Sequence, residues 1–329
     1  MAYRNATNGM TRNRQSGMTL VEVLVALAIG SFLMIGAVQV YNQSRQAFVI
    51  NESIARVQET AQFAMDTLES DLRMASNWGM HSRGVAVEGR ALIADPNPNA
   101  LPAPAGCGAD WALDLARPVE GNNNAYGLPC GPTGGAQGNS DTITVRRATV
   151  AATPLAAGRL QIQSSRIQGA LFADGAIPAG FTAADSETHD LMVSTYYVAA
   201  NSALIPGVPT LRRQTLQGGG GGPTITDQEI APGVENIQMQ LGVDVDEDNT
   251  VDRYVNPGDA ILDPTDANYI PGIRVITARV WMVVRGVSAE VGIQDNVNYA
   301  PGDVNLGQFN DQFRRMIVSK TILLRNARS

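Results

Sequence analysis

The stretch MTLVEVLVALAIGSFLMIGAVQVY, residues 18–41, contains 24 residues and one charged side chain, Glu22. A helix of about 20 apolar residues crosses the roughly 30 Å hydrocarbon core of a bilayer, so this stretch is long enough to span a membrane. A carboxylate deep in a bilayer is unfavourable by about 3 kcal/mol, and a chain that needed only an anchor would leave it out. Glu22 therefore indicates a second role for the segment.

The charges around this stretch predict its orientation. The first 17 residues hold Arg4, Arg12 and Arg14 and no acidic residue, and the next basic residue is Arg45. The positive-inside rule then keeps residues 1–17 in the cytoplasm and exports the chain beyond the apolar run. A secretory signal peptide is cleaved after its apolar run, whereas Gly17 precedes this one. We therefore expect the run to stay in the mature protein, with an uncleaved single-pass anchor as the alternative.

The segment GMTLVE, residues 17–22, resembles the class III signal of type IV prepilins. That signal consists of a short basic leader, a glycine, an apolar residue and a glutamate as the fifth mature residue. In the family, a membrane-embedded prepilin peptidase cuts after the glycine and methylates the new amino terminus. The resemblance implies cleavage between Gly17 and Met18, N-methylation of Met18, and pairing of Glu22 with the free amine of a neighbouring subunit. Phe is usual at the first mature position, which is Met18 here.

A helical pattern continues beyond the membrane-length stretch. Apolar residues recur every three or four positions, which predicts one buried stripe on a helix. The stripe comprises Ile50, Ile54, Val57, Ala61, Ala64, Leu68, Leu72 and Ala75, and the opposite, polar face comprises Asn51, Glu52, Gln58, Glu59, Asp66 and Glu69. No proline occurs between Met18 and Asp95. We expect one helix from Met18 to about Ser76, with an apolar half (18–41) and an amphipathic half (42–77).

Residues 78–140 are rich in Gly, Pro, Asn and Ala and are expected to form an irregular insert. Both cysteines of the chain, Cys107 and Cys130, lie in it. Outside the cytosol an even cysteine count in a loop predicts one disulfide, which would pin the insert. Two unpaired thiols are the alternative for a cytosolic chain.

Residues 141–329 are predicted to form a β-sheet head. The expected strands are Asp141–Val150, Arg159–Ser164, Leu191–Ala199, Thr210–Leu216, Val234–Val243, Ile273–Val287 and Phe313–Arg325. Within Ile273–Val287, apolar residues alternate from Ile276 to Val284, which fits an antiparallel sheet covered on one side. The helical stripe is the natural cover. Gly218–Gly222, five glycines in a row, is expected to be a flexible loop.

Several of these segments resemble the PilW family of minor pilins. Residues 56–80, RVQETAQFAMDTLESDLRMASNWGM, match its helix end through Asp71–Ala75 (DLRMA) and a Trp/Gly-rich turn. STYYVAANS, LRRQTL, APGVENIQMQLGVDVDED and SKTILLRNARS follow in the family's order. The resemblance implies an α+β pilin fold, in which a long N-terminal α-helix packs on an antiparallel β-sheet head.

The acidic segment DVDEDNTVD, residues 244–252, has the spacing of a cation-binding loop. Asp244, Asp246, Asp248 and Asp252 occupy relative positions 1, 3, 5 and 9, as in the EF-hand, and Thr250 would offer its backbone carbonyl. Asn249 replaces the turn glycine and tolerates the left-handed conformation. Val255 stands at position 12, where the EF-hand has an acid, and Asp259 or Asp263 could supply that ligand from further along the chain. The loop is a candidate Ca²⁺ site, with a solvated acidic hairpin as the alternative.

The charge distribution argues against nucleic acid as a main ligand. The net charge is −7, and because the leader carries +3 the remainder is −10. Such a body would repel phosphates. The arginine pairs Arg146–Arg147, Arg212–Arg213 and Arg314–Arg315 could form a local basic patch, but paired arginines on strands usually form a solvated face.

The sequence predicts a structural subunit rather than an enzyme. It contains no nucleophile elbow, P-loop or metal-binding histidine cluster, and no small-molecule substrate is expected. The leading hypothesis is a minor pilin that primes type IV pilus assembly, with prepilin peptidase and other minor and major pilins as partners. It would sit in the inner membrane with a periplasmic head, and then in the pilus. The alternatives are a minor pseudopilin of the type II secretion system and a tip adhesin or DNA-binding module.

Overall fold

The computed structural model describes residues 17–91, 97–104 and 106–328. The chain divides into two units, one that ends at Glu52 and one that begins at Ser53. The first 16 residues of the expected cytoplasmic leader, with Arg4, Arg12 and Arg14, lie outside the described residues.

Helix α1 runs from Leu20 to Met74, 55 residues, close to the bounds that the sequence predicted. Its apolar half contains a window long and apolar enough to cross a membrane, and none of that window is buried. Large apolar side chains such as Leu20, Phe32 and Val40 are all more than half exposed. Length and composition of this half thus fit a membrane anchor.

The amphipathic half of α1 buries the predicted stripe from Val57 onward, whereas Ile50 is exposed and Ile54 is only partly buried. Val57, Ala61, Ala64, Leu68, Leu72 and Ala75 are all at most 3% exposed. The assignment of Glu69 to the solvent face is wrong, because this residue is buried. Its carboxylate pairs with Arg73 and with Lys320 of strand β14 (Arg315–Leu323). The partner Lys320 comes from a distant strand, so the periodicity of the helix could not predict that Glu69 is buried.

All seven predicted strands are present. They are β3 (Thr142–Ala148), β4 (Gln161–Ser164), β6 (Glu187–Ala199), β7 (Thr210–Gln217), β9 (Val234–Asp244), β11 (Arg274–Arg285) and β14. The sequence did not predict β1 (Val87–Glu88), β2 (Val119–Asn122), β5 (Gly169–Phe172), β8 (Thr224–Pro232), β10 (Arg253–Val255), β12 (Asn298–Tyr299) and β13 (Gly307–Gln308). Gly218–Gly222 lies between β7 and β8, as expected.

The described residues also form one short α-helix and short 3₁₀ turns. They are α2 (Ala109–Leu113) and the 3₁₀ turns η1 (Gly84–Ala86), η2 (Ala260–Leu262) and η3 (Arg325–Arg328).

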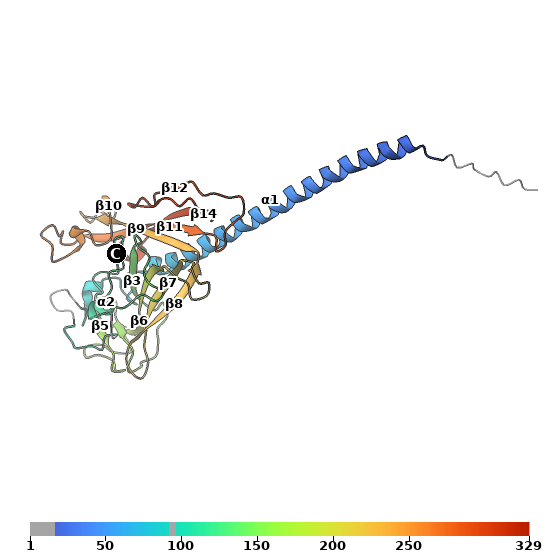
Figure 1. Ribbon diagram of the computed structural model, residues 1–329. Helices are drawn as coiled ribbons and strands as arrows, with labels where there is room; N and C mark the ends of the chain where they lie inside the picture. The colour runs from blue at the N-terminus through green and yellow to red at the C-terminus, as the bar shows by residue number, and fades with distance from the viewer. Residues whose placement is uncertain (1–16, 92–96, 105, 329) are drawn as a thin grey trace, which may run out of the picture. The chain divides into compact units, whose positions relative to one another are not determined.

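A four-stranded antiparallel sheet, in the order β10-β9-β11-β14, packs its apolar face on the helical stripe (Figure 1). The alternating residues Ile276, Ala278, Val280, Met282 and Val284 of β11 are at most 1% exposed. Ala278, Val280, Met282 and Val284 share one core with Leu68 and Leu72 of α1 and with Ile143 and Tyr196 of β3 and β6. The predicted cover of this sheet by the helix is therefore confirmed.

The second sheet has eight strands and supports a second core. Its main path is β1-β5-β4-β6-β3-β2, and β7 joins β6 to β8. Trp78, Trp111 and Leu113 pack there against Ile162 of β4 and Val193 of β6. The described residues of the 78–140 segment thus form only short elements, yet their aromatic and apolar side chains make up much of this core.

Candidate functional site

Helix α1 begins with a reciprocal cap that involves Glu22. The backbone N–H and the hydroxyl of Thr19 each donate to Glu22 Oε2 at 3.0 Å, and the Glu22 N–H donates to Thr19 Oγ1 at 3.3 Å. This is the capping box, in which Ser or Thr at the N-cap and Glu three residues later satisfy the free N–H groups of the first turn. The Thr-x-x-Glu spacing was present in the sequence, but the resemblance to prepilins pointed only to intersubunit pairing.

The cap fixes Glu22 close to the predicted processing point. Gly17 and Met18 precede the helix and are exposed, and Met18 is 70% exposed. Cleavage after Gly17 would create an amine on Met18, one residue before the capping threonine. A carboxylate, a hydroxyl and this amine would then share one end of an apolar helix.

The arginine pairs are not solvated faces, and this expectation is wrong. Arg146, Arg212 and Arg315, one from each pair, are buried. Arg146 bonds Glu120 at 2.5 Å and backbone oxygens of Trp111 and Arg117, and Arg212 bonds Asp227 at 2.8 Å. Apart from Asp311, which is four positions before Arg315, the acidic partners lie 15 or more positions from their arginines, which is why a local pattern could not identify them.

Arg315 lies at the centre of the densest of these networks. Its guanidinium contacts Glu235 at 2.6 Å, Asp295 at 3.0 Å and Asp311 at 2.6 Å, and it stacks 3.8 Å from the centroid of the Phe309 ring. Burial by itself would lower the pKa of Arg315, but the hydrogen bonds to Asp311 and Glu235 hold that pKa above its usual range. The network ties β14 to β9 and to the segment before β14.

Asp71 links the end of α1 to the larger sheet. Its carboxylate accepts from Arg147 Nη2 of β3 at 2.9 Å and from the Tyr196 hydroxyl of β6 at 2.6 Å. Burial, followed by the nearby charge of Asp71, raises the pKa of Tyr196 above its usual value. The Asp-Leu-Arg-Met-Ala segment therefore has a structural role, since its first residue anchors the helix end.

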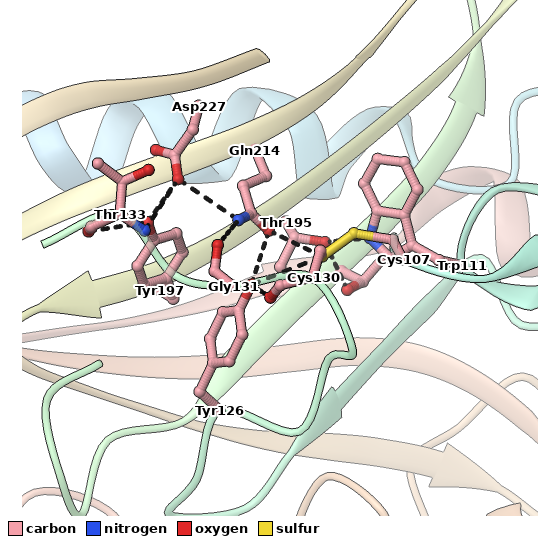
Figure 2. The surroundings of a disulfide bond; sticks show 11 residues. Cys107, Trp111, Tyr126, Cys130, Gly131, Thr133, Thr195, Tyr197, Gln214 and Asp227 are labelled. Atoms are coloured by element: carbon pink, nitrogen blue, oxygen red, sulfur yellow. Dashed lines mark hydrogen bonds between the residues drawn. A yellow bond between two sulfur atoms is a disulfide. The ribbon is translucent and has the colours of Figure 1, made fainter. Parts of the chain in front are cut away.

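Cys107 and Cys130 form the predicted disulfide, as Figure 2 shows. Tyr126 lies beside it, with its hydroxyl 2.7 Å from the Cys130 carbonyl oxygen and 2.9 Å from Gln214 Oε1 of β7. The Nε1 group of Trp111 donates to Thr195 Oγ1 of β6 at 2.7 Å. The bridge thus closes the insert at a place where it is hydrogen-bonded to two strands of the head.

Asp141 directly precedes β3, and its carboxylate is buried. Among the described residues, no basic side chain forms an ion pair with it. It is 1% exposed, and its two oxygens accept the backbone N–H groups of Asn124 and Met239 at 2.7 Å each. Burial raises the pKa of Asp141 to about 6, although these two hydrogen bonds act in the opposite direction.

The acidic loop connects β9 to β10. The structure brings Asp244, Asp246 and Asp252 together, with one carboxylate oxygen of each within 4.8 Å of the others. Asp248 lies outside this group, and its carboxylate accepts from the N–H and the hydroxyl of Thr250 at 2.7 Å. Asn249 has a φ of 66°, the left-handed conformation that the sequence suggested.

The residues suggested as replacements for the missing twelfth ligand are engaged elsewhere. Asp259 accepts from Ile261 N at 3.1 Å and Asp263 accepts from Thr265 N at 2.9 Å, so each stabilises its own turn.

Two stretches of the chain match known protein families. Residues 12–38 match the prokaryotic N-terminal methylation motif, and residues 195–326 match the type IV pilus-assembly protein W, PilW. The second match covers the region from the end of β6 through β14, whereas the Asp71–Ala75 segment lies outside both. No curated protein and no solved structure matches the chain.

The methylation motif on a long apolar helix, followed by a mostly β head, defines a prepilin-type protein with a pilin-like α+β architecture. The match of residues 195–326 adds that the head is similar to PilW, a type IV pilus-assembly protein.

Proposed function

We propose that this chain is a minor pilin that primes assembly of the type IV pilus and is incorporated into it. The PilW match of residues 195–326 carries the proposal, and the methylation motif supports it by implying the processing step that pilins share. In this proposal prepilin peptidase cleaves after Gly17 and methylates Met18 in the inner membrane. The exposed apolar half of α1 then passes from lipid to contacts with other pilins, and twitching motility and surface attachment depend on the resulting fibre.

Glu22 would act at two stages of this process. Before assembly its carboxylate accepts two hydrogen bonds from Thr19 and closes the start of α1. In the fibre the carboxylate would instead pair with the Met18 amine of a neighbouring subunit. An ion pair away from water is directional, because an unpaired charge there is strongly unfavourable. In the capping box the Glu22 carboxylate thus stays hydrogen-bonded to Thr19 until the amine of a neighbouring subunit is available to pair with it.

The substitution Glu22→Gln separates these two roles. Glutamine also serves in a capping box, so the variant keeps the helix start but loses the charge. We expect normal membrane insertion and cleavage, and incorporation into sheared fibres reduced about tenfold or more, which corresponds to about 1.4 kcal/mol or more. The matched control is Thr19→Ala, which removes half of the cap and keeps the charge and should incorporate nearly normally. Normal incorporation of Glu22→Gln would contradict the pairing role.

A deletion strain tests the function itself. Loss of surface pili with unchanged secretion of type II substrates supports the minor pilin. The reverse pattern would assign the chain to the type II secretion system instead.

A further inference from the structure

The turn between β9 and β10 gathers more negative charge than the structure neutralises. Five acidic residues lie within the nine positions from Asp244 to Asp252. Arg274 of β11 is the single basic side chain that the described residues pair with this group, through its Nη2 atom 2.7 Å from Asp244 Oδ2. The rest of the charge has no counterion within the described part of the chain.

The three clustered carboxylates lie close enough together to share one calcium ion. Ca²⁺ binds oxygen ligands at about 2.4 Å, so two ligands on opposite sides of the ion lie about 4.8 Å apart. The ligand oxygens of Asp244, Asp246 and Asp252 all fall within 4.8 Å of one another. Mg²⁺ binds at about 2.1 Å and demands a regular octahedron, so it tolerates a smaller spread of ligands.

Asp244 provides a second, independent observation. This residue is completely buried, and its two carboxylate oxygens differ in their hydrogen-bond partners. Oδ2 accepts from Asn249 N at 3.0 Å and from Arg274, whereas Oδ1 is buried and has no hydrogen-bond partner among the described residues. A buried carboxylate oxygen without a donor is strongly unfavourable unless a cation binds it. Because Arg274 occupies Oδ2, Oδ1 is the oxygen left to bind an ion.

We propose that Asp244, Asp246 and Asp252 bind one Ca²⁺ ion at the β9–β10 turn. Arg274 is a positioning residue that holds the buried carboxylate with Oδ1 free. Asp248, which a simple EF-hand spacing would include, is not among the proposed ligands, because it lies outside the group of three and its Oδ1 accepts from Thr250. The ion would join the start of the turn at Asp244 to its end at Asp252 and so stabilise the hairpin. This proposal does not depend on the role of the protein in the pilus.

Calorimetric titration of the full-length protein in detergent micelles tests the site. After removal of divalent ions with a chelator, CaCl₂ should bind with one-to-one stoichiometry and a Kd of about 1 mM or tighter, as for extracellular calcium modules. Asp246→Asn should weaken binding about tenfold or more, because it removes a charged ligand. This side chain is exposed, so the variant should keep its fold, which circular dichroism checks.

Two further variants make the test specific to these ligands. Asp248→Asn should change the Kd by less than about threefold, and so should the matched control Asp266→Asn, an exposed aspartate that accepts from Asn268 N in another turn. The proposal is overturned if the wild type shows no saturable calcium binding, if Asp246→Asn binds normally, or if MgCl₂ binds equally well. A loss in Asp248→Asn equal to that in Asp246→Asn would overturn the ligand set.

Discussion

The apolar half of α1 and the head differ in how they satisfy a carboxylate. From Met18 to Tyr41 the helix holds one acidic residue, and Glu22 bonds to a threonine three positions away. Asp71, at the far end of α1, and Glu235, in the head, bond to side chains that are 76 and 80 positions away. An apolar helix by itself offers only local partners, whereas strands bring distant residues together. A local partner can be exchanged without unfolding anything, but the distant pairs are part of the fold.

This difference predicts that charge removal has opposite consequences in the two regions. In the apolar half it should affect assembly and leave folding intact, as in the test of Glu22→Gln. In the head, removal of a charge from a buried ion pair should lower the free energy of unfolding. Three tests beyond the apolar half, from the largest expected effect to the smallest, sharpen this comparison.

Arg315→Met should have the largest effect. It leaves the buried carboxylate of Asp295 without a cation and leaves Glu235 with only Arg285, at 4.0 Å. Loss of one partner from a buried pair lowers the free energy of unfolding by about 4 kcal/mol. Urea denaturation measures this loss. The matched control is Arg166→Met, an exposed arginine, which should change the unfolding free energy by less than about 0.5 kcal/mol. Equal effects of the two changes would contradict the idea that the head depends on paired buried charge.

The double change Cys107→Ser and Cys130→Ser should rank second. The two cysteines are separated by 23 positions, and opening a loop of this length lowers the unfolding free energy by about 3 kcal/mol in the chain-entropy account. Wild-type protein in reducing agent should show the same urea midpoint as the variant. An unchanged midpoint in both would mean that the insert does not share the cooperative unfolding of the head.

Asp141 should give the smallest effect, visible as a dependence on pH. Burial raises its pKa from 3.8 to about 6, so folding favours the protonated form. The stability that this group contributes is complete below about pH 4 and is lost as the pH rises through 6. The unfolding free energy of the wild type, measured relative to Asp141→Asn, should therefore fall by about 2 kcal/mol between about pH 4.5 and 7. A difference that does not vary with pH would contradict this account.

Local patterns in the sequence were sufficient for the main elements. The three-to-four-residue spacing from Val57 to Ala75 identified the buried stripe, and the alternation in β11 identified its apolar face. The strands that the sequence did not predict are either short, such as β5 and β10, or polar. The edge strand β8, with Thr224, Asp227 and Glu229, is an example of a polar one. Such strands are stabilised by their neighbours, so their own residues carry little periodic signal.

The candidate sites divide in the same way. Gly17, Met18 and Glu22 could be predicted as site residues from contiguous sequence, because a processing signal is a linear motif. The acidic loop was also recognised, but only the folded turn separated Asp244, Asp246 and Asp252 from Asp248.

The sequence by itself determined the membrane-length helix, its continuation as an amphipathic helix, the order of the main strands and the pairing of the only two cysteines. The tertiary structure decided which charged residues are buried and what they contact. Arg146, Arg212 and Arg315 look like surface residues in the sequence, and each is buried against carboxylates. Hydrophobic periodicity depends on neighbours within a few positions, whereas the cost of burying a charge depends on partners that only the fold brings within reach.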